Sequence, residues 1–143
     1  GGEEGIHRRL EQEHVESVMN AFLTCLADYS TDNRGDVGSW VREATMVALE
    51  QVVPLIVFRD SKSAPHPCWL TPDLVKRMLD QFIQQLCEKI DRIRSRAGAS
   101  LLSLLRLQPP LPHVPKRELL MQVLQNESHP TMQVDWKSPA ATF

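Results

Sequence analysis

The chain has 143 residues, a length typical of one domain that can bury a substantial core. Its 16 basic and 18 acidic residues nearly balance at a net charge of -2, so no overall positive field attracts nucleic acid as a partner. No run approaches the ~18 apolar residues of a membrane span. Three separated cysteines without a C-x-x-C pair are typical of a reducing compartment, and we expect a cytoplasmic chain with reduced thiols.

The stretch that follows a glycine-rich start predicts a helix. Residues 1–5 are set aside as a possible tag or linker. Residues 6–26 carry apolar side chains at the three-and-four spacing of one helical face. The members of this stripe are Ile6, Leu10, Val18, Met19, Phe22, Leu23 and Leu26. Residues 28–36 then supply short polar side chains and Gly35, which favour a chain reversal. We therefore expect a tight turn into an antiparallel helix.

A second helix is predicted after this turn, and residues 6–58 should form one antiparallel helix pair. Asp36 or Ser39 can cap the second helix by accepting exposed backbone amides. Its apolar stripe consists of Val37, Val41, Ala44, Thr45, Ala48, Leu49 and Val52. We expect the helix to end near Val53, because Pro54 lacks the amide hydrogen that a helix interior needs.

The next part of the chain predicts a linker and two further helices. Residues 59–71 have the composition of a surface linker. Thr71-Pro72 is typical of a helix start, and the apolar stripe that follows predicts one long helix to Ala97, ended by Gly98. Residues 99–107 are apolar enough to be its buried helical partner.

Prolines organise the end of the chain. Four prolines between Pro109 and Pro115 predict an extended crossing. Pro115 can open a short helix whose apolar face runs to Leu124. We place the second helix pair and this short helix at residues 72–126, and the start of a truncated further repeat at 127–143.

Four strings, in order along the chain, carry a family resemblance. Within the first, Asp36 in the turn precedes Val41 and Arg42 with the spacing of a HEAT repeat. The strings are RGDVGSWVREA, EKIDRIRSRAG, PPLPHVPKRELL and VDWKSPAATF. Together they resemble the family of tubulin-folding cofactor D, a large HEAT-repeat chaperone that handles tubulin. The resemblance implies an all-α fold, a HEAT/armadillo-type α-solenoid segment of antiparallel helix pairs.

The same resemblance implies a function. It implies a chaperone segment that binds β-tubulin and acts with tubulin-folding cofactor E and an Arf-like small GTPase, with GTPase activator activity, in assembling and dismantling the tubulin heterodimer. It also implies a cytoplasmic protein of the microtubule cytoskeleton. A solenoid suits this role because its long concave surface can hold a large folded client.

The first string contains three candidates for structural or interaction roles, Asp36, Trp40 and Arg42. Arg42 can bond Asp36 or an aspartate of a neighbouring repeat, and we favour a ladder that aligns stacked repeats over contact with a partner. Trp40 suits a half-buried site between repeats, which we favour, or an exposed anchor for a partner.

Three further candidates, Lys89, Arg92 and Arg96, form a basic stripe that we place at the C-terminal end of the long helix, where the helix dipole favours positive charge. They could meet an acidic surface such as that of tubulin. We favour a solvated flank in which Glu88 and Asp91 are local partners.

No residue pattern indicates catalysis, a cofactor or a metal. The phosphate-binding, dinucleotide-binding and serine-hydrolase motifs are absent from the sequence. His7 and His14 share a helix face but lie about two turns apart, too far for a compact metal site. The rival interpretations are a generic HEAT-repeat interaction scaffold and a small helical enzyme, and the lack of convergent titratable groups argues against the enzyme.

Overall fold

The computed structural model describes residues 2–33, 35–62 and 68–127, with side chains from residue 11 onward except residue 32. Within these ranges the chain forms five helices and one very short pair of strands. The helices are α1 (Gly2–Leu26), α2 (Gly38–Lys62), α3 (Pro72–Leu86), α4 (Asp91–Leu105) and α5 (Arg117–Glu127). The strands are β1 (Thr31–Asp32) and β2 (Gly35–Asp36), which pair antiparallel in the turn between α1 and α2.

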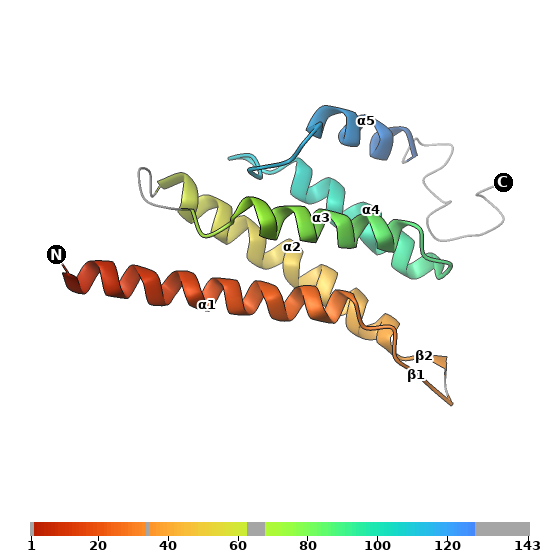
Figure 1. Ribbon diagram of the computed structural model, residues 1–143. Coiled ribbons are helices and arrows are strands. Elements are labelled where there is room, and N and C mark those ends of the chain that lie inside the picture. The colour runs from red at the N-terminus through yellow and green to blue at the C-terminus, as the bar shows by residue number, and fades with distance from the viewer. Residues whose placement is uncertain (1, 34, 63–67, 128–143) are drawn as a thin grey trace.

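The helices alternate in direction and stack in two layers (Figure 1). One layer holds α1 and α3, the other holds α2 and α4, and α5 packs against α4. The core lies between the layers and includes Met46 of α2, Phe82 of α3 and Leu101 of α4, none of which is exposed. The predicted all-α fold, a helical-repeat segment of antiparallel pairs, is confirmed. Its division at residues 71 and 126 stays a prediction.

The turn between α1 and α2 lies at the predicted place, and two glycines shape it. Gly35 has a φ of 110°, which side chains other than glycine rarely adopt. Gly38 lies at a close approach: its amide donates to the Ser30 carbonyl at 2.9 Å, and a Cβ there would meet the Asp28 carbonyl oxygen at 2.3 Å. The hairpin is therefore folded back against the first turn of α2.

The expected end of the second helix near Val53 is wrong, because α2 continues through Pro54 to Lys62. Proline inside a helix costs about 3 kcal/mol. Val53, Ile56 and Val57 are buried on both sides of it, and burial of each such side chain contributes about 1.5 to 3 kcal/mol. The packing of this face therefore outweighs the missing hydrogen bond.

The predicted long helix to Ala97 is also wrong. The chain leaves the helix after Leu86 and starts α4 at Asp91, so that Gly98 lies inside α4 rather than at a helix end. Arg94 stabilises the break, because its Nη1 donates to the carbonyl oxygens of Glu88 at 2.7 Å and Lys89 at 2.9 Å. The three-and-four spacing persists across the break and cannot reveal it.

Several expected core residues are exposed. On α2 the buried apolar residues are Met46, Leu49, Val53, Ile56 and Val57, whereas Val41 and Ala44 of the predicted stripe face solvent. Val18 of the predicted α1 stripe is exposed as well. Apolar residues occur on more than one face of α2, so the spacing of apolar residues alone could not show which face packs against the core.

The remaining predicted helix ends agree in part. Thr71 caps α3, since its Oγ1 accepts the Leu74 amide at 3.2 Å, and Pro72 occupies the first turn. The last helix begins at Arg117, two residues after Pro115, because Lys116 adopts a φ of 51° that no helix continues. The truncated repeat expected at 127–143 lies outside the described residues, except for its first residue, which ends α5.

We predict that Gly38→Ala lowers the free energy of unfolding by about 1 to 3 kcal/mol, because the new Cβ must displace backbone in the hairpin. Urea denaturation followed by circular dichroism measures the change. The control is Gln51→Ala at an exposed position of α2, where we expect a change within about 0.5 kcal/mol. Equal stability of Gly38→Ala and the control would contradict the close contact between residue 38 and the Asp28 carbonyl.

Candidate interaction site

The guanidinium of Arg42 is fully buried and joins four parts of the chain. Its Nη1 donates to the Asp28 carbonyl oxygen at 2.7 Å, and its Nη2 lies 3.1 Å from Asp36 Oδ2. Its Nε donates to Gln85 Oε1 of α3 at 2.9 Å. Glu88 Oε2, just beyond α3, lies 3.6 Å from Nη2. Arg42 therefore bonds both its own turn and the following helix pair.

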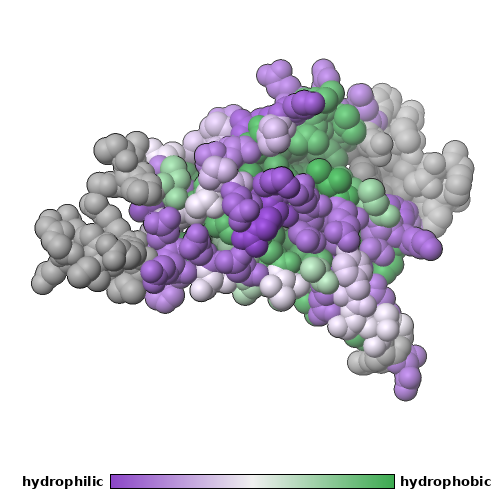
Figure 2. All heavy atoms as spheres, in the orientation of Figure 1, coloured by the Kyte–Doolittle hydropathy of each residue, from purple (hydrophilic) through white to green (hydrophobic). Residues whose placement is uncertain are grey.

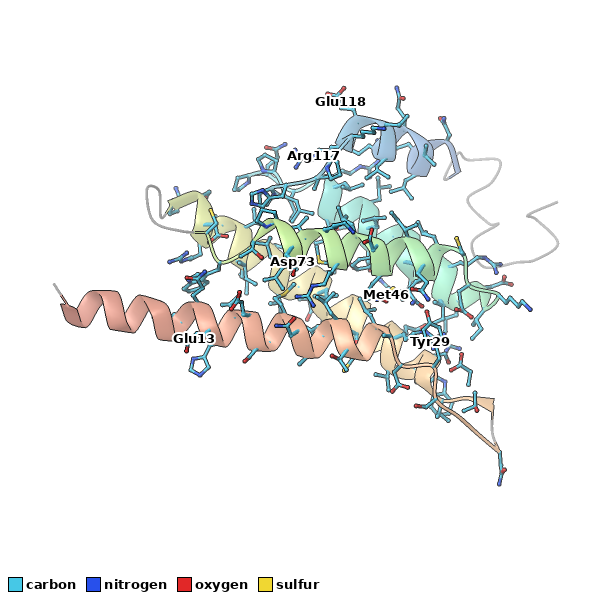
Figure 3. The ribbon with its side chains drawn as sticks, in the orientation of Figure 1. Glu13, Tyr29, Met46, Asp73, Arg117 and Glu118 are labelled. Atoms are coloured by element: carbon cyan, nitrogen blue, oxygen red, sulfur yellow. The ribbon has the colours of Figure 1, made fainter. Side chains whose placement is uncertain are left out.

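Tyr29 completes this cluster. We call it the Arg42 cluster, and its members are Arg42, Asp28, Asp36, Gln85, Glu88 and Tyr29. The ring of Tyr29 lies under the guanidinium, 4.2 Å from ring centroid to Cζ. Gln85 Nε2 donates to the Tyr29 hydroxyl at 2.9 Å and to the Leu26 carbonyl at 3.3 Å. Figure 3 shows Tyr29 where α1 runs into the hairpin. The cluster thus fixes the end of α1 against α2 and α3.

The carboxylate of Asp36 serves two structures at once. Its Oδ1 accepts the Ser39 amide at 2.9 Å, which caps α2 as the sequence predicts. The hydrogen bond from Arg42 lowers the pKa of Asp36 below its usual 3.8, with a further contribution from the Ser39 amide. Two carboxylates, Asp36 and Glu88, flank one guanidinium. The buried positive charge is therefore neutralised by acids that remain partly exposed.

A second buried acid holds the other end of α2. Asp60 Oδ1 and Oδ2 accept the amides of Trp69 and Leu70, each at 3.0 Å. Arg59 pairs with Asp60 at 2.9 Å and stacks over the Trp69 ring, with its Cζ 3.7 Å from the centroid. These bonds fix the chain just before Thr71 starts α3. Residues 59–62, expected in a linker, thus belong to α2.

The basic stripe does not lie at a helix C-terminus. Lys89 precedes α4, and Arg92 and Arg96 occupy its first half, because the chain breaks after Leu86. Their partners also differ from the expected Glu88 and Asp91. Arg92 Nε lies 2.5 Å from Glu43, and Arg96 Nη1 lies 3.7 Å from Glu50, both on α2. The stripe therefore links α2 to α4.

An open hollow of about 670 Å³ lies beside these ion pairs. Glu43 of α2 borders it, with Arg92, Ser95, Arg96 and Ala99 of α4. Arg92 also donates from Nη2 to Ser39 Oγ at 3.3 Å. The α2–α4 layer thus presents paired charges of both signs around a depression. We call this surface the α2–α4 face and include Trp40, on the first turn of α2, in it.

Trp40 and Lys89 are the most accessible candidates. Trp40 is 55% exposed and follows the capped start of α2, whereas its sequence favoured a half-buried packing site. Lys89 is exposed in the connection between α3 and α4. The structure thus separates the six candidates into a bonded pair, in which Arg42 is buried and Asp36 partly exposed, and accessible groups on or beside α2 and α4. Their roles in binding stay predictions.

Sequence reasoning missed four polar residues that these arrangements need. A signal existed for Gln85, because it lies seven residues after Met78 and three after Phe82, on the buried face of α3. A polar residue at a core position needs hydrogen-bond partners, which Arg42 and Tyr29 supply. Glu43, Glu50 and Asp60 gave no such signal, since acids on a helix are ordinarily solvated.

No group of three or more histidine, cysteine or acidic side chains in the described part of the chain could hold a metal ion. The side chain of His7 lies outside those residues. Among the described helices, none is long and apolar enough to cross a membrane.

Comparisons with known proteins agree on one family. The family described as "Tubulin folding cofactor D C terminal" matches residues 76–143. "Tubulin-specific chaperone D" of Dictyostelium discoideum is 32% identical over 119 residues, which make up 75% of this chain and 8% of that relative. "Tubulin-folding cofactor D" of Schizosaccharomyces pombe is 33% identical over 89 residues, or 62% of this chain and 7% of the relative. No solved structure matches the chain significantly.

We predict that Arg42→Ala lowers the free energy of unfolding by about 2 to 4 kcal/mol, because it leaves Gln85 and two carboxylates without their donor. The control is Arg92→Ala, which removes a half-exposed pair and should cost less than about 1 kcal/mol. Chemical denaturation of both variants measures the difference. Similar losses of unfolding free energy in the two variants would show that the buried Arg42 bonds stabilise the fold no more than an exposed ion pair does.

We predict that the contribution of Asp36 depends on pH. Because folding lowers its pKa below 3.8, its ionised form stabilises the fold above the unfolded pKa, and this stabilisation is lost as the pH falls through the folded pKa. The stability difference between the wild type and Asp36→Asn should be constant from about pH 6 to 8 and shrink below about pH 4. Denaturation midpoints of both proteins measured across this pH range test the prediction. A stability difference that stays the same at every pH would refute it.

Proposed function

The chain belongs to the tubulin-folding cofactor D family, and we propose that it forms part of a tubulin chaperone, contributing a rigid surface that binds β-tubulin. Two observations together support the proposal: the chain matches relatives named for tubulin folding, and its helical stack presents accessible charged and aromatic groups on the α2–α4 face. The chain spans under a tenth of the length of the relatives it matches. Binding by this stretch alone is therefore one contribution among several.

The chemistry of the α2–α4 face supports a protein partner. Arg92 and Arg96 are accessible to the carboxylates of a partner protein, because the Arg92 side chain is half exposed and Arg96 lies 3.7 Å from Glu50. Exposed pairs of this kind contribute little to folding, yet charges around an interface steer encounter and select the partner. Trp40 adds the kind of large amphipathic ring that is enriched in binding hot spots.

The rigidity of the stack supports the same proposal. The Arg42 cluster fixes one end of α2 and Asp60 fixes the other. A surface on a helix that is held at both ends loses little conformational freedom when a client binds, so less binding energy is spent on ordering. A solenoid built this way can add modest contacts along its length.

The finer assignments form part of the proposal. We propose that the whole protein acts with tubulin-folding cofactor E and an Arf-like small GTPase, with GTPase activator activity, in assembling and dismantling the tubulin heterodimer. Its location would then be the cytoplasm and the microtubule cytoskeleton. The names of the relatives support the role of a tubulin chaperone.

Two other readings are weaker. A generic HEAT-repeat scaffold fits the fold equally well, but the matched relatives are named for tubulin folding. A helical enzyme would require convergent titratable groups, and the acids of the described chain with lowered pKa values, Asp28 and Asp36, bond to Ser30 and Arg42 within the hairpin region.

We predict that immobilised tubulin heterodimer binds the 143-residue chain in biolayer interferometry, and that the double variant Trp40→Ala/Arg92→Ala weakens binding at least fivefold. Loss of one aromatic contact and one interfacial charge accounts for a change of this size. The matched control is Arg77→Ala, which removes an exposed, ion-paired arginine from α3 in the opposite layer.

The control separates the surface from general charge effects. Arg77→Ala should bind tubulin as the wild type does. Equal weakening by both changes would exclude the α2–α4 face as the contact. Absence of binding by the chain, while a full-length family member binds in the same assay, would exclude this stretch as a tubulin-binding part.

A further inference from the structure

An apolar groove lies between α3 and α5. It encloses about 630 Å³, within the usual range of ligand pockets. Figure 2 shows apolar surface gathered between these two helices. Its walls come from α3, from α5 and from the loop that leads into α5. The lining residues that matter most are Leu79, Ile83, His113, Lys116, Leu119 and Leu120.

The groove exists because α5 packs against α4 and leaves its side toward α3 uncovered. Leu124 is buried and Leu120 packs partly against the core. Leu119, one position away on the helix, is 54% exposed, and Ile83 faces the same groove from α3 at 40% exposure. Leu79 is buried and forms the floor. Large apolar side chains thus converge on a hollow without filling it.

The loop at the mouth of the groove has an unusual backbone. His113 has a φ of 63° and Lys116 a φ of 51°, and these are the described non-glycine residues with positive φ. Such conformations cost free energy and persist where surrounding contacts impose them. Buried Leu111 holds the loop from one side, and Arg117 donates a hydrogen bond to its carbonyl oxygen. Both strained residues line the groove.

The rim carries a surplus of positive charge. Lys76 is paired with Asp80 at 2.8 Å on α3, and both border the groove. Lys116 is exposed and makes no ion pair within the described part of the chain. His113 adds a ring that can donate a hydrogen bond. A bound molecule with carboxylates at this rim would supply an ion-pair partner for Lys116.

We propose that this groove binds a short amphipathic helix of a partner protein, with leucine-like side chains on one face and acidic residues beside them. The α3 wall runs from Pro72 to Ile83, a rise of roughly 16 Å along the helix axis, which matches about three turns of a bound helix. Helices recognised in this manner insert apolar side chains at the three-and-four spacing. Lys116 selects acidic flanks over basic ones.

The test uses a fluorescein-labelled helical peptide of about ten residues, with leucine at every third or fourth position and glutamate elsewhere, and a matched peptide with lysine for glutamate. Fluorescence anisotropy measures binding to the whole 143-residue chain. We expect saturable binding of the glutamate peptide and at least fivefold weaker binding of the lysine peptide. Added salt should weaken the preference, because the rim is exposed.

Three variants locate the binding. Leu119→Asp changes an exposed residue, so the chain should keep its helical circular dichroism while binding falls at least tenfold. Lys116→Glu should lower glutamate-peptide binding and raise that of the lysine peptide. The control, Leu55→Asp, changes a leucine of α2 that is 70% exposed and lies outside the groove, and should leave binding intact.

Other outcomes overturn the proposal. The proposal is wrong if the two peptides bind equally well, or if Leu119→Asp leaves peptide binding unchanged. It is also wrong if binding does not saturate up to about 1 mM. Displacement of the probe by a synthetic peptide of residues 128–143 would assign the groove to the chain itself. A dimer in sedimentation velocity that dissociates with Leu119→Asp would assign it to a second copy.

Discussion

Burial of the Arg42 guanidinium is the constraint on which this arrangement of helices depends. An arginine removed from water must find a partner for its positive charge and its hydrogen-bond donors. Here those partners come from the turn, from Gln85 of α3 and from Glu88, two residues beyond α3. Because the partners lie on separate segments, the turn after α1 and the helices α2 and α3 must all be in place before the charge is satisfied.

The opposite end of α2 is fixed by a buried negative group, where the first end has a buried positive one. A buried carboxylate, Asp60, accepts backbone amides from the chain that enters α3. Between these polar ends, the apolar residues around Pro54 pack into the core. The polar bonds thus determine direction and register, while hydrophobic burial supplies most of the stabilisation, since it scales with apolar area and is indifferent to exact partners.

The sequence predicted the helical class, the turn at residues 28–36 and the Thr71 start, because these follow from periodicity and local hydrogen-bonding chemistry. It could not predict the break after Leu86, since Arg94 satisfies the loop carbonyls from a later helix. Nor could it choose between the two apolar faces of α2. For the candidate site, it named Asp36 and Arg42, but Gln85 and the Glu43 and Glu50 partners required the packing of separate helices.

The bond from Arg42 to Gln85 crosses from the first helix pair to the second. In repeat proteins, the energy that couples neighbours decides whether units melt together or one by one. A coupling concentrated in buried polar bonds is directional, and it breaks over a short displacement, unlike an apolar interface that can slide. We therefore expect the two pairs to unfold together, and α5, which packs on α4 by apolar contact, to separate more easily.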